Sequence, residues 1–251
     1  MRLTVLGAGP AYTDRPEAAG ASYLVSSGTT NVLLDLGHGS FSRIFAAVAP
    51  EDLAAVAISH LHPDHFVDLV PFRHYLRYYL HPSRRMRVIG PGDLATRLDA
   101  LHAEPGFASQ ALDIEPIGSS DHAVGDLVVR ARKIAHTDDS YGMRVSREPD
   151  ASTGAGLVYS GDCGRADDLR PLIAPGDTLL TEVSFGPGPV PAGVLHLDGP
   201  AVGALAAATG VGRVLLTHLQ MGFDPGATLA SVRTAYDGPV EFVWPGSQIE
   251  I

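Results

Sequence analysis

The amino-acid sequence predicts an α/β fold of four layers, αββα, in which two β-sheets pack face to face and helices cover their outer surfaces. Three observations predict this architecture. The chain has 251 residues, of which 45% are apolar, and this is enough to bury a sizeable core. Short apolar strands alternate with helical segments in both halves, a pattern typical of sheets covered by helices. Histidines and aspartates follow several of the predicted strands, and sheet proteins commonly gather their ligands at strand ends.

Strands dominate the beginning of the chain. Short apolar segments bounded by Gly, Ser or Asn predict strands at Leu3–Leu6, Ser22–Val25, Val32–Asp35 and Ala54–Ser59. Helices are expected at Phe41–Val48, Leu69–Leu80 and Leu94–Leu101, with a short strand at Arg87–Ile89.

Strands and helices alternate in the second half. The predicted strands are Leu112–Ile117, Leu127–Ile134, Met143–Ser146, Leu157–Ser160, Thr178–Glu182, Val214–Thr217 and Val240–Trp244. The predicted helices are Ala166–Ile173, Ala201–Thr209 and Ala227–Ala235. A polar turn is expected at Arg147–Gly156 and a Pro/Gly loop at Gly186–Ala192. Neither is long enough for a linker, so we expect a single domain over residues 1–251.

Composition and charge exclude several classes of protein. The single cysteine, Cys163, excludes an internal disulfide framework and a cysteine-rich zinc site. No apolar run approaches the ~20 residues of a membrane helix, and Met1–Gly9 resembles a strand more than a signal peptide, so we expect a cytoplasmic protein without a membrane partner. The formal net charge of -10 lowers the expectation of a large polyanionic ligand, because proteins that hold long nucleic acids are usually basic.

The strongest chemical motif is the segment Ser-His-Leu-His-Pro-Asp-His at positions 59–65. It places His60, His62, Asp64 and His65 directly after a predicted buried strand. Imidazole and carboxylate groups are ligands for zinc, manganese or iron, and no thiolate is needed. A compact loop stiffened by Pro63 lets these side chains converge, so the segment predicts a metal site.

Three further candidate ligands each follow a predicted strand. They are His136, Asp162 and His218. Since neighbouring strand ends meet at one edge of a sheet, these side chains can join the first cluster. Seven ligands are about the number that two divalent metal ions require, with zinc expected first and manganese or iron also compatible.

These residues, in this order, resemble the pattern of the metallo-β-lactamase superfamily over nearly the whole chain. The resemblance implies a metallo-β-lactamase fold and a hydrolase with two metals. His60, His62 and His136 would hold one metal, Asp64, His65 and His218 the other, and Asp162 would bridge both. It further implies that a hydroxide held between the metals is the nucleophile.

Four features resemble the ribonuclease Z-like phosphodiesterase branch. Asp162 is a carboxylate where true lactamases usually have another residue. The run Phe-Val-Asp-Leu-Val-Pro-Phe after His65 resembles the branch's D-H-x-x-x-L-P run. The segment 180–185 resembles its H-E-A-T-F segment, with Glu182 matching and Thr181 in place of the histidine. The segment 195–199 resembles its H-S-T segment, in which the histidine faces the scissile phosphate, and this identifies His196.

The resemblance therefore implies catalytic roles beyond metal ligation. His196 is expected to stabilise the transition state or to protonate the leaving oxygen, and Glu182 to accept the other ring N–H of His196 and fix its tautomer. Asp64 is also expected to be a catalytic residue. A structural alternative is that His196 only begins a helix whose N-cap is Asp198.

The expected substrate is a small phosphodiester such as a cyclic nucleotide. Only 25 residues separate His136 from Asp162, which leaves no room for the protruding arm with which transfer-RNA-processing members grip RNA. Transfer RNA is therefore disfavoured, while short RNA stays open. One alternative is a carboxylic-ester or lactone hydrolase on the same metals. Another is a metal- or ligand-binding regulatory protein without turnover.

Two surface features remain open. The segment Phe72–Arg87 interleaves aromatic and basic residues, so it could bind substrate, form an interface or pack into the core. Because related enzymes are often homodimers through this region, a homodimer is expected. Asp138, Asp139 and Ser140 follow His136 and are candidates for hydrogen bonds that orient the ligating histidines.

Overall fold

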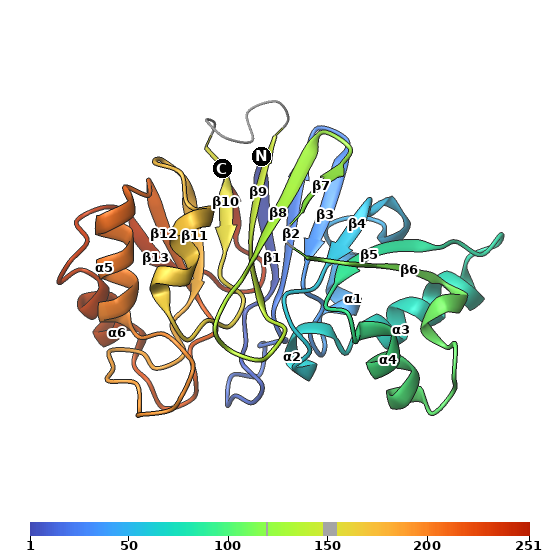
Figure 1. Cartoon of the computed structure of the whole chain (residues 1–251), viewed down its shortest axis with the longest axis horizontal. Coiled ribbons are helices and arrows are strands. Elements are labelled where there is room, and N and C mark those ends of the chain that lie inside the picture. Colours follow the sequence, from blue (N-terminus) through green and yellow to red (C-terminus); the bar gives the residue numbers. More distant parts are fainter. Residues whose placement is uncertain (119, 148–154) are drawn as a thin grey trace.

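Two sheets of seven strands each form the centre of the computed structural model, which describes residues 1–118, 120–147 and 155–251 (Figure 1). In both sheets the strands on one side pair antiparallel and the strands on the other side pair parallel. The first sheet runs in the order β14 (Gln248–Glu250), β1 (Arg2–Gly7), β2 (Ser22–Ser27), β3 (Thr30–Leu34), β4 (Ala55–Ala57), β5 (Met86–Gly90), β6 (Leu112–Pro116). The second runs in the order β13 (Val240–Phe242), β12 (Arg213–Thr217), β11 (Thr178–Glu182), β10 (Leu157–Tyr159), β9 (Tyr141–Arg147), β8 (Leu127–Lys133), β7 (Asp121–Val124).

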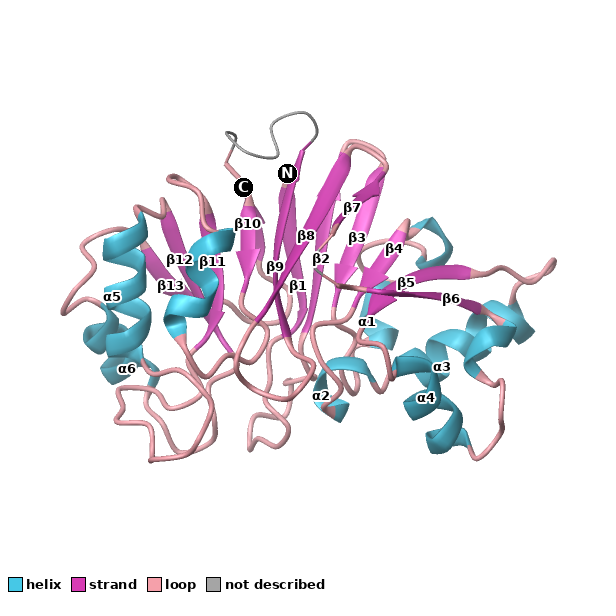
Figure 2. Cartoon of the chain, viewed as in Figure 1, coloured by secondary structure: helices cyan, strands magenta, loops and turns pink. Residues whose placement is uncertain are grey.

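Helices cover the outer face of each sheet (Figures 1 and 2). The first sheet is covered by α1 (Phe41–Ile44), α2 (Pro63–Phe66), α3 (Leu69–His74), η2 (Tyr75–Tyr79) and α4 (Leu94–His102), with short 3₁₀ turns η1 (Pro50–Asp52) and η3 (Ala108–Gln110). The second is covered by η4 (Ala166–Leu172), α5 (Gly199–Thr209) and α6 (Pro225–Val232). No helix in the described part of the chain is long and apolar enough to cross a membrane.

Three apolar clusters separate the four layers. Strand β2 contributes side chains to two of these clusters, because successive side chains point to opposite faces of a sheet. Tyr23 and Val25 lie in the core between the sheets, whereas Leu24 lies in the core beneath the helices of the first sheet. A third core packs α5 and α6 against the second sheet through Val202 and Val232. The αββα prediction is confirmed.

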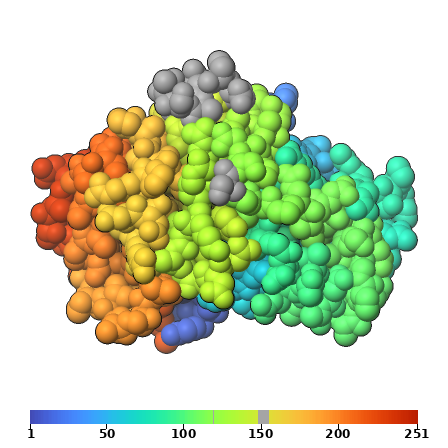
Figure 3. Space-filling model, in the orientation of Figure 1, coloured from blue at the N-terminus to red at the C-terminus, as the bar shows by residue number. Residues whose placement is uncertain are grey.

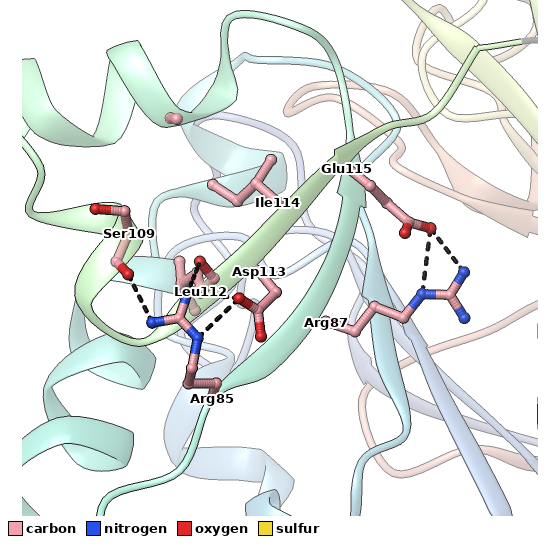
Figure 4. A pocket seen from close by; sticks show the side chains of 8 residues that line it. Arg85, Arg87, Ser109, Leu112, Asp113, Ile114 and Glu115 are labelled. Atoms are coloured by element: carbon pink, nitrogen blue, oxygen red, sulfur yellow. Dashed lines mark hydrogen bonds and ion pairs between the residues drawn. The ribbon is translucent and has the colours of Figure 1, made fainter.

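Charged pairs cover the free edge of the first sheet. Arg85 precedes β5 and donates from Nε to Asp113 Oδ1 on β6 at 2.7 Å, and Arg87 donates from Nη2 to Glu115 Oε1 at 2.7 Å (Figure 4). These residues line a surface hollow of about 690 Å³, but both guanidinium groups are already neutralised there. Charged side chains on an edge strand also discourage pairing with another chain.

Several predicted elements differ in the structure. The helix expected at Leu69–Leu80 changes after His74 into a π-helical turn, and the one expected at Ala166–Ile173 is 3₁₀, with Pro171 unable to donate an N–H inside it. Strands β7 and β14 were not predicted, because their exposed or half-buried residues carry little apolar pattern. The short helix α2 was not predicted either. Residues 148–154 of the expected polar turn Arg147–Gly156 lie outside the described residues.

Candidate metal centre

Strand ends bring the predicted ligands to one end of the sandwich, where long loops gather (Figure 2). In the second sheet, β10, β11 and β12 run parallel, and β8 has the same direction because it is antiparallel to β9. Their carboxyl ends lead to His136, Asp162 and His218 at the same edge. The first sheet contributes β4, which delivers the chain through Ser59 into His60.

The first group of potential ligands contains His60, His62, His136 and Asp162, whose ligand atoms all lie within 4.8 Å of one another. His136 Nε2 lies 3.1 Å from His62 Nδ1 and 3.7 Å from Asp162 Oδ2. His60 Nε2 lies 3.9 Å from the same Asp162 oxygen.

The second group contains Asp64, His65, Asp162 and His218, within the same limit. His65 Nε2 lies 3.2 Å from Asp162 Oδ1, and His218 Nε2 lies 3.3 Å from Asp64 Oδ2 and 3.5 Å from Asp162 Oδ1. Asp162 thus belongs to both groups and presents one oxygen to each. The structure brings all seven predicted ligands together.

The donor atoms fit divalent cations. Among the described residues, His60 Nε2 and Asp162 Oδ1 are buried side-chain atoms without a hydrogen-bond partner. Buried polar atoms are normally satisfied, so these two indicate a partner that is not a protein group. The surrounding imidazoles and carboxylates are the donor types of zinc, manganese and iron sites. The clusters therefore suit a dinuclear metal centre.

Hydrogen bonds to the other ring nitrogen orient three of these histidines. Ser59 Oγ lies 3.0 Å from His60 Nδ1, Asp35 Oδ2 lies 2.7 Å from His65 Nδ1, and Ser184 Oγ lies 3.1 Å from His218 Nδ1. Such bonds fix the ring orientation and the tautomer of a ligating histidine.

Asp35 anchors this arrangement. The side chain of this fully buried residue also accepts from Ser59 N at 2.6 Å, and from Ser59 Oγ and Tyr159 Oη at 2.7 Å each. Sequence reasoning missed the orienting roles of Asp35, Ser59, Tyr159 and Ser184. Ser59 is the neighbour of His60 in the chain, whereas the partners of the other three come from distant parts of the chain.

The prediction that Asp138, Asp139 and Ser140 orient the ligating histidines is wrong. Asp139 accepts from Gly92 N and Tyr141 Oη, and Ser140 Oγ bonds to Thr137. No hydrogen bond found in the described residues joins Asp138, Asp139 or Ser140 to a clustered histidine. The ring of His136 is held instead by the carbonyl oxygen of Leu195, 2.7 Å from Nδ1.

Two residues of the centre adopt a left-handed backbone conformation that non-glycine residues rarely adopt. Asp35 has φ 59° and His218 has φ 58°. Such a conformation costs about 1–3 kcal/mol and persists only where the surroundings enforce it. Both side chains are held by hydrogen bonds within the centre, so the strain coincides with the position that ligation requires.

Charge coupling within the cluster keeps its carboxylates ionised. Burial favours the neutral acid, yet hydrogen bonding to His218 and the charge of His65 lower the pKa of Asp64 to about 2. Burial likewise opposes ionisation of Asp162, but His218 and His65 hold its pKa well below the usual range. Burial and the neighbouring His65 lower the pKa of His60, which favours the neutral imidazole that binds metals.

Beside the two clusters lies a hydrogen-bonded pair, Glu182 and His196. Glu182 is the last residue of β11 and is 1% exposed. His196 Nδ1 lies 3.0 Å from Glu182 Oε1 and 3.1 Å from Oε2, and 4.0 Å from Asp162 Oδ2. The same two oxygens accept from Cys163 N at 2.6 Å and Ser184 N at 3.2 Å. Burial lowers the pKa of His196, but the bond to Glu182 and its charge outweigh burial and raise it.

The N-cap prediction also holds in the structure. Asp198 caps α5 by accepting from Ala201 N at 3.0 Å. His196 lies two residues before this cap and outside the helix, so capping by Asp198 does not account for the position of His196.

A hollow of about 350 Å³ opens over the two clusters. Its wall contains Pro10, Ala11 and Tyr12 of the β1–β2 loop, together with His62, Pro63, Asp64, Asp162, His196, His218 and Gln220. No lysine or arginine is among these lining residues. A second hollow beside His62 carries Asp93, Asp138 and Asp139 with Arg97. The surroundings of the centre are therefore not basic.

The segment Phe72–Arg87 lies away from this hollow and lines none of it. Phe72, Arg73 and Leu76 are buried in the core or beneath the helices, whereas Tyr78 and Tyr79 are exposed. One face of this segment therefore packs into the core, as one of the three alternatives expected.

Comparisons with known proteins place the chain among metal-dependent hydrolases. A family model described as "Beta-lactamase superfamily domain" matches residues 30–219, the range that contains all seven clustered ligands. An uncharacterized protein of Mycobacterium leprae is 32% identical, covering 100% of this chain and 89% of the relative. A ribonuclease Z of Mycobacterium bovis is 27% identical, with 96% and 95% covered. The crystal structure of the metallo-β-lactamase fold protein YhfI of Bacillus subtilis has a TM-score of 0.86 at 24% identity, covering 100% of this chain and 98% of that chain.

Proposed function

Because the chain belongs to the metallo-β-lactamase superfamily and resembles its ribonuclease Z-like branch, we propose that it is a dinuclear metal-dependent phosphodiesterase acting on a small phosphodiester such as a cyclic nucleotide. His60, His62 and His136 would hold one metal and Asp64, His65 and His218 the other, with Asp162 shared by the two ligand groups. When bound, two divalent cations, zinc in the first place, would supply an activated water and would neutralise charge on the reacting phosphate.

The pair of Glu182 and His196 is the observation that carries the phosphodiesterase assignment. The imidazole of His196 belongs to neither of the two four-residue ligand groups, yet it lines the hollow, and its Nδ1 lies 4.0 Å from Asp162 Oδ2. Glu182 engages Nδ1, which leaves Nε2 as the ring nitrogen available to a substrate. As the ester P–O bond breaks, His196 transfers the proton on Nε2 to the leaving oxygen. Glu182 keeps the ring oriented and stabilises its protonated form.

The size and charge of the site favour a small substrate. The hollow of about 350 Å³ is at the small end of the range for ligand pockets. A polyanion would meet Asp93, Asp138 and Asp139 beside the centre, in a chain with net charge -10. The connection between β9 and β10 is also too short in sequence for an RNA-gripping arm. These features support a cyclic nucleotide over transfer RNA, although the relative named ribonuclease Z keeps short RNA as a substrate to be tested.

The test compares wild type with His196→Ala on four substrates in the presence of zinc or manganese. The substrates are bis(p-nitrophenyl) phosphate, 3′,5′-cyclic AMP, a short RNA and a simple lactone. We expect phosphodiester cleavage by the wild type and a loss of about 10²- to 10⁴-fold in kcat for His196→Ala, the range of a general acid. Metal content, measured by elemental analysis, should be the same in both proteins.

Three outcomes would contradict the proposal. Lactone cleavage alone, indifferent to His196, would assign the centre to carboxylic-ester chemistry. Loss of metal in His196→Ala would make this residue a ligand and not a proton donor. Preference for the short RNA over the cyclic nucleotide would contradict the small-substrate argument.

A further inference from the structure

Tyr12 is an exposed aromatic residue on the wall of the hollow over the metal centre. Its side chain is 65% exposed, and it makes no hydrogen bond or ring contact with any other residue that the structure describes. An aromatic ring that lines a substrate hollow and has a free face can stack on a base. Tyr12 lies outside the range 30–219 that the family model matches.

The loop that carries Tyr12 is fastened on both sides. On one side, Ala8 O accepts from His218 N at 3.1 Å. On the other, Arg15 Nη1 donates to Leu219 O at 2.9 Å, and its guanidinium lies 5.5 Å from the centre of the Trp244 ring. Both hydrogen bonds join the loop to the segment that follows β12, and they hold the residues between Ala8 and Arg15 beside the metal centre. In Figure 3 the blue surface of this loop borders the orange surface of the segment near residue 190.

The side-chain carboxamide of Gln220 is a second group that lines the same hollow. It follows His218 and Leu219, so it comes from the segment to which the loop is fastened. Its backbone N–H donates to Ser184 O at 3.3 Å, whereas its side-chain carboxamide has no hydrogen bond within the described residues. A carboxamide offers two donor hydrogens and an acceptor oxygen in one plane. It can therefore pair with the edge of a flat heterocycle.

We propose that Tyr12 and Gln220 form a nucleobase subsite, with Tyr12 stacking on the base and Gln220 hydrogen-bonding to its edge. The substrate is then a nucleobase-bearing phosphodiester, and the metal centre acts on the phosphate while this subsite holds the base. This inference rests on the proposed phosphodiesterase function and narrows it. A base is favoured over a second phosphate because no lysine or arginine is among the residues that line the hollow.

The test measures discrimination between substrates that share the same reacting phosphate. Kinetics with 3′,5′-cyclic AMP and with abasic 1-deoxyribose 3′,5′-cyclic phosphate give the preference of kcat/KM for the base-bearing substrate. We expect Tyr12→Ala to lower that preference roughly 5- to 150-fold, the range for one base stacked on an aromatic ring. Tyr12→Phe keeps the ring and should retain the preference, and Gln220→Ala should lower it by a smaller factor.

A binding experiment tests the nucleobase subsite independently of catalytic turnover. Saturation-transfer NMR with adenosine on protein treated with a chelator should show contact with the base protons in wild type and Tyr12→Phe, and little contact in Tyr12→Ala. An unchanged preference together with unchanged NMR contact in Tyr12→Ala would overturn the subsite while the phosphodiesterase function stands. If the wild type cleaves neither phosphodiester, the proposed function fails, and the subsite fails with it.

Discussion

Replacing Glu182 by glutamine tests whether this residue acts through His196. The carboxylate is 1% exposed and accepts from Cys163 N, Ser184 N and His196 Nδ1. A carboxamide has one oxygen, so its NH₂ must face one of the two backbone N–H groups. A buried donor left unpaired costs about 1–3 kcal/mol. For a protein of this size, each kcal/mol lowers Tm by about 2–4 °C, so we expect a decrease of about 2–12 °C.

The same substitution weakens the positioning of His196. A hydrogen bond to a charged group contributes about 1.5–3 kcal/mol, which corresponds to a decrease in kcat of roughly 10- to 150-fold if the whole contribution is lost. The decrease should fall on kcat more than on KM, because Glu182 does not line the substrate hollow. Metal content should be unchanged.

A double-mutant cycle gives the sharpest assay. If Glu182 acts only through His196, then Glu182→Gln has no further effect on kcat in the His196→Ala background. Nitrogen-15 NMR of the His196 ring should show the altered tautomer or protonation state in Glu182→Gln. Glu241→Gln, on the exposed face of β13, is the matched control for the chemical change. Multiplicative losses in the double mutant, or loss of metal from Glu182→Gln, would refute the reasoning.

Two further predictions concern the support beneath the centre. Asp35→Asn places a donor among four donating groups, so we expect destabilisation of about 1–3 kcal/mol for each donor left unpaired, together with a lower metal content. Denaturant unfolding and elemental analysis measure the two effects, and wild-type values for both would contradict the anchoring role. In Gly37→Ala the new Cβ would lie 1.8 Å from Asp64 O, so we expect at least about 1–3 kcal/mol of destabilisation and weaker metal binding. The control is Gly92→Ala, which has open space around its Cβ and should change neither stability nor metal binding. Equal effects of the two substitutions would count against the close contact at Gly37.

The metal-ligand pattern is the part of the site that local sequence describes best. His60, His62, Asp64 and His65 are close in the chain, and their chemical types identify metal ligation without knowledge of the fold. His136, Asp162 and His218 follow recognisable strands, and strand direction brings them to the same edge. The consecutive apolar residues in strands such as β2 likewise predict that each sheet has two buried faces.

The orienting groups could not be identified in the same way. Asp35 and Tyr159 are joined by a hydrogen bond across the sandwich, although they are 124 positions apart in the chain. The acceptor that holds His136 is the carbonyl of Leu195, and every residue type carries a carbonyl. The segment after His136 offered polar side chains at a suitable spacing, but its hydrogen bonds turn to its own loop and to Gly92.

The sequence by itself therefore determined the layered fold and the identity of the seven clustered residues, because periodicity and ligand chemistry are properties of residue type and local spacing. The family resemblance already implied that Glu182 pairs with His196, and the structure places the two in contact. Tertiary structure alone decided which groups orient the clustered residues, and that Tyr12 and Gln220 share one hollow. These relations depend on distances between segments that are remote in the chain. Such distances are set by the packing of two sheets and their loops, and no local pattern records them.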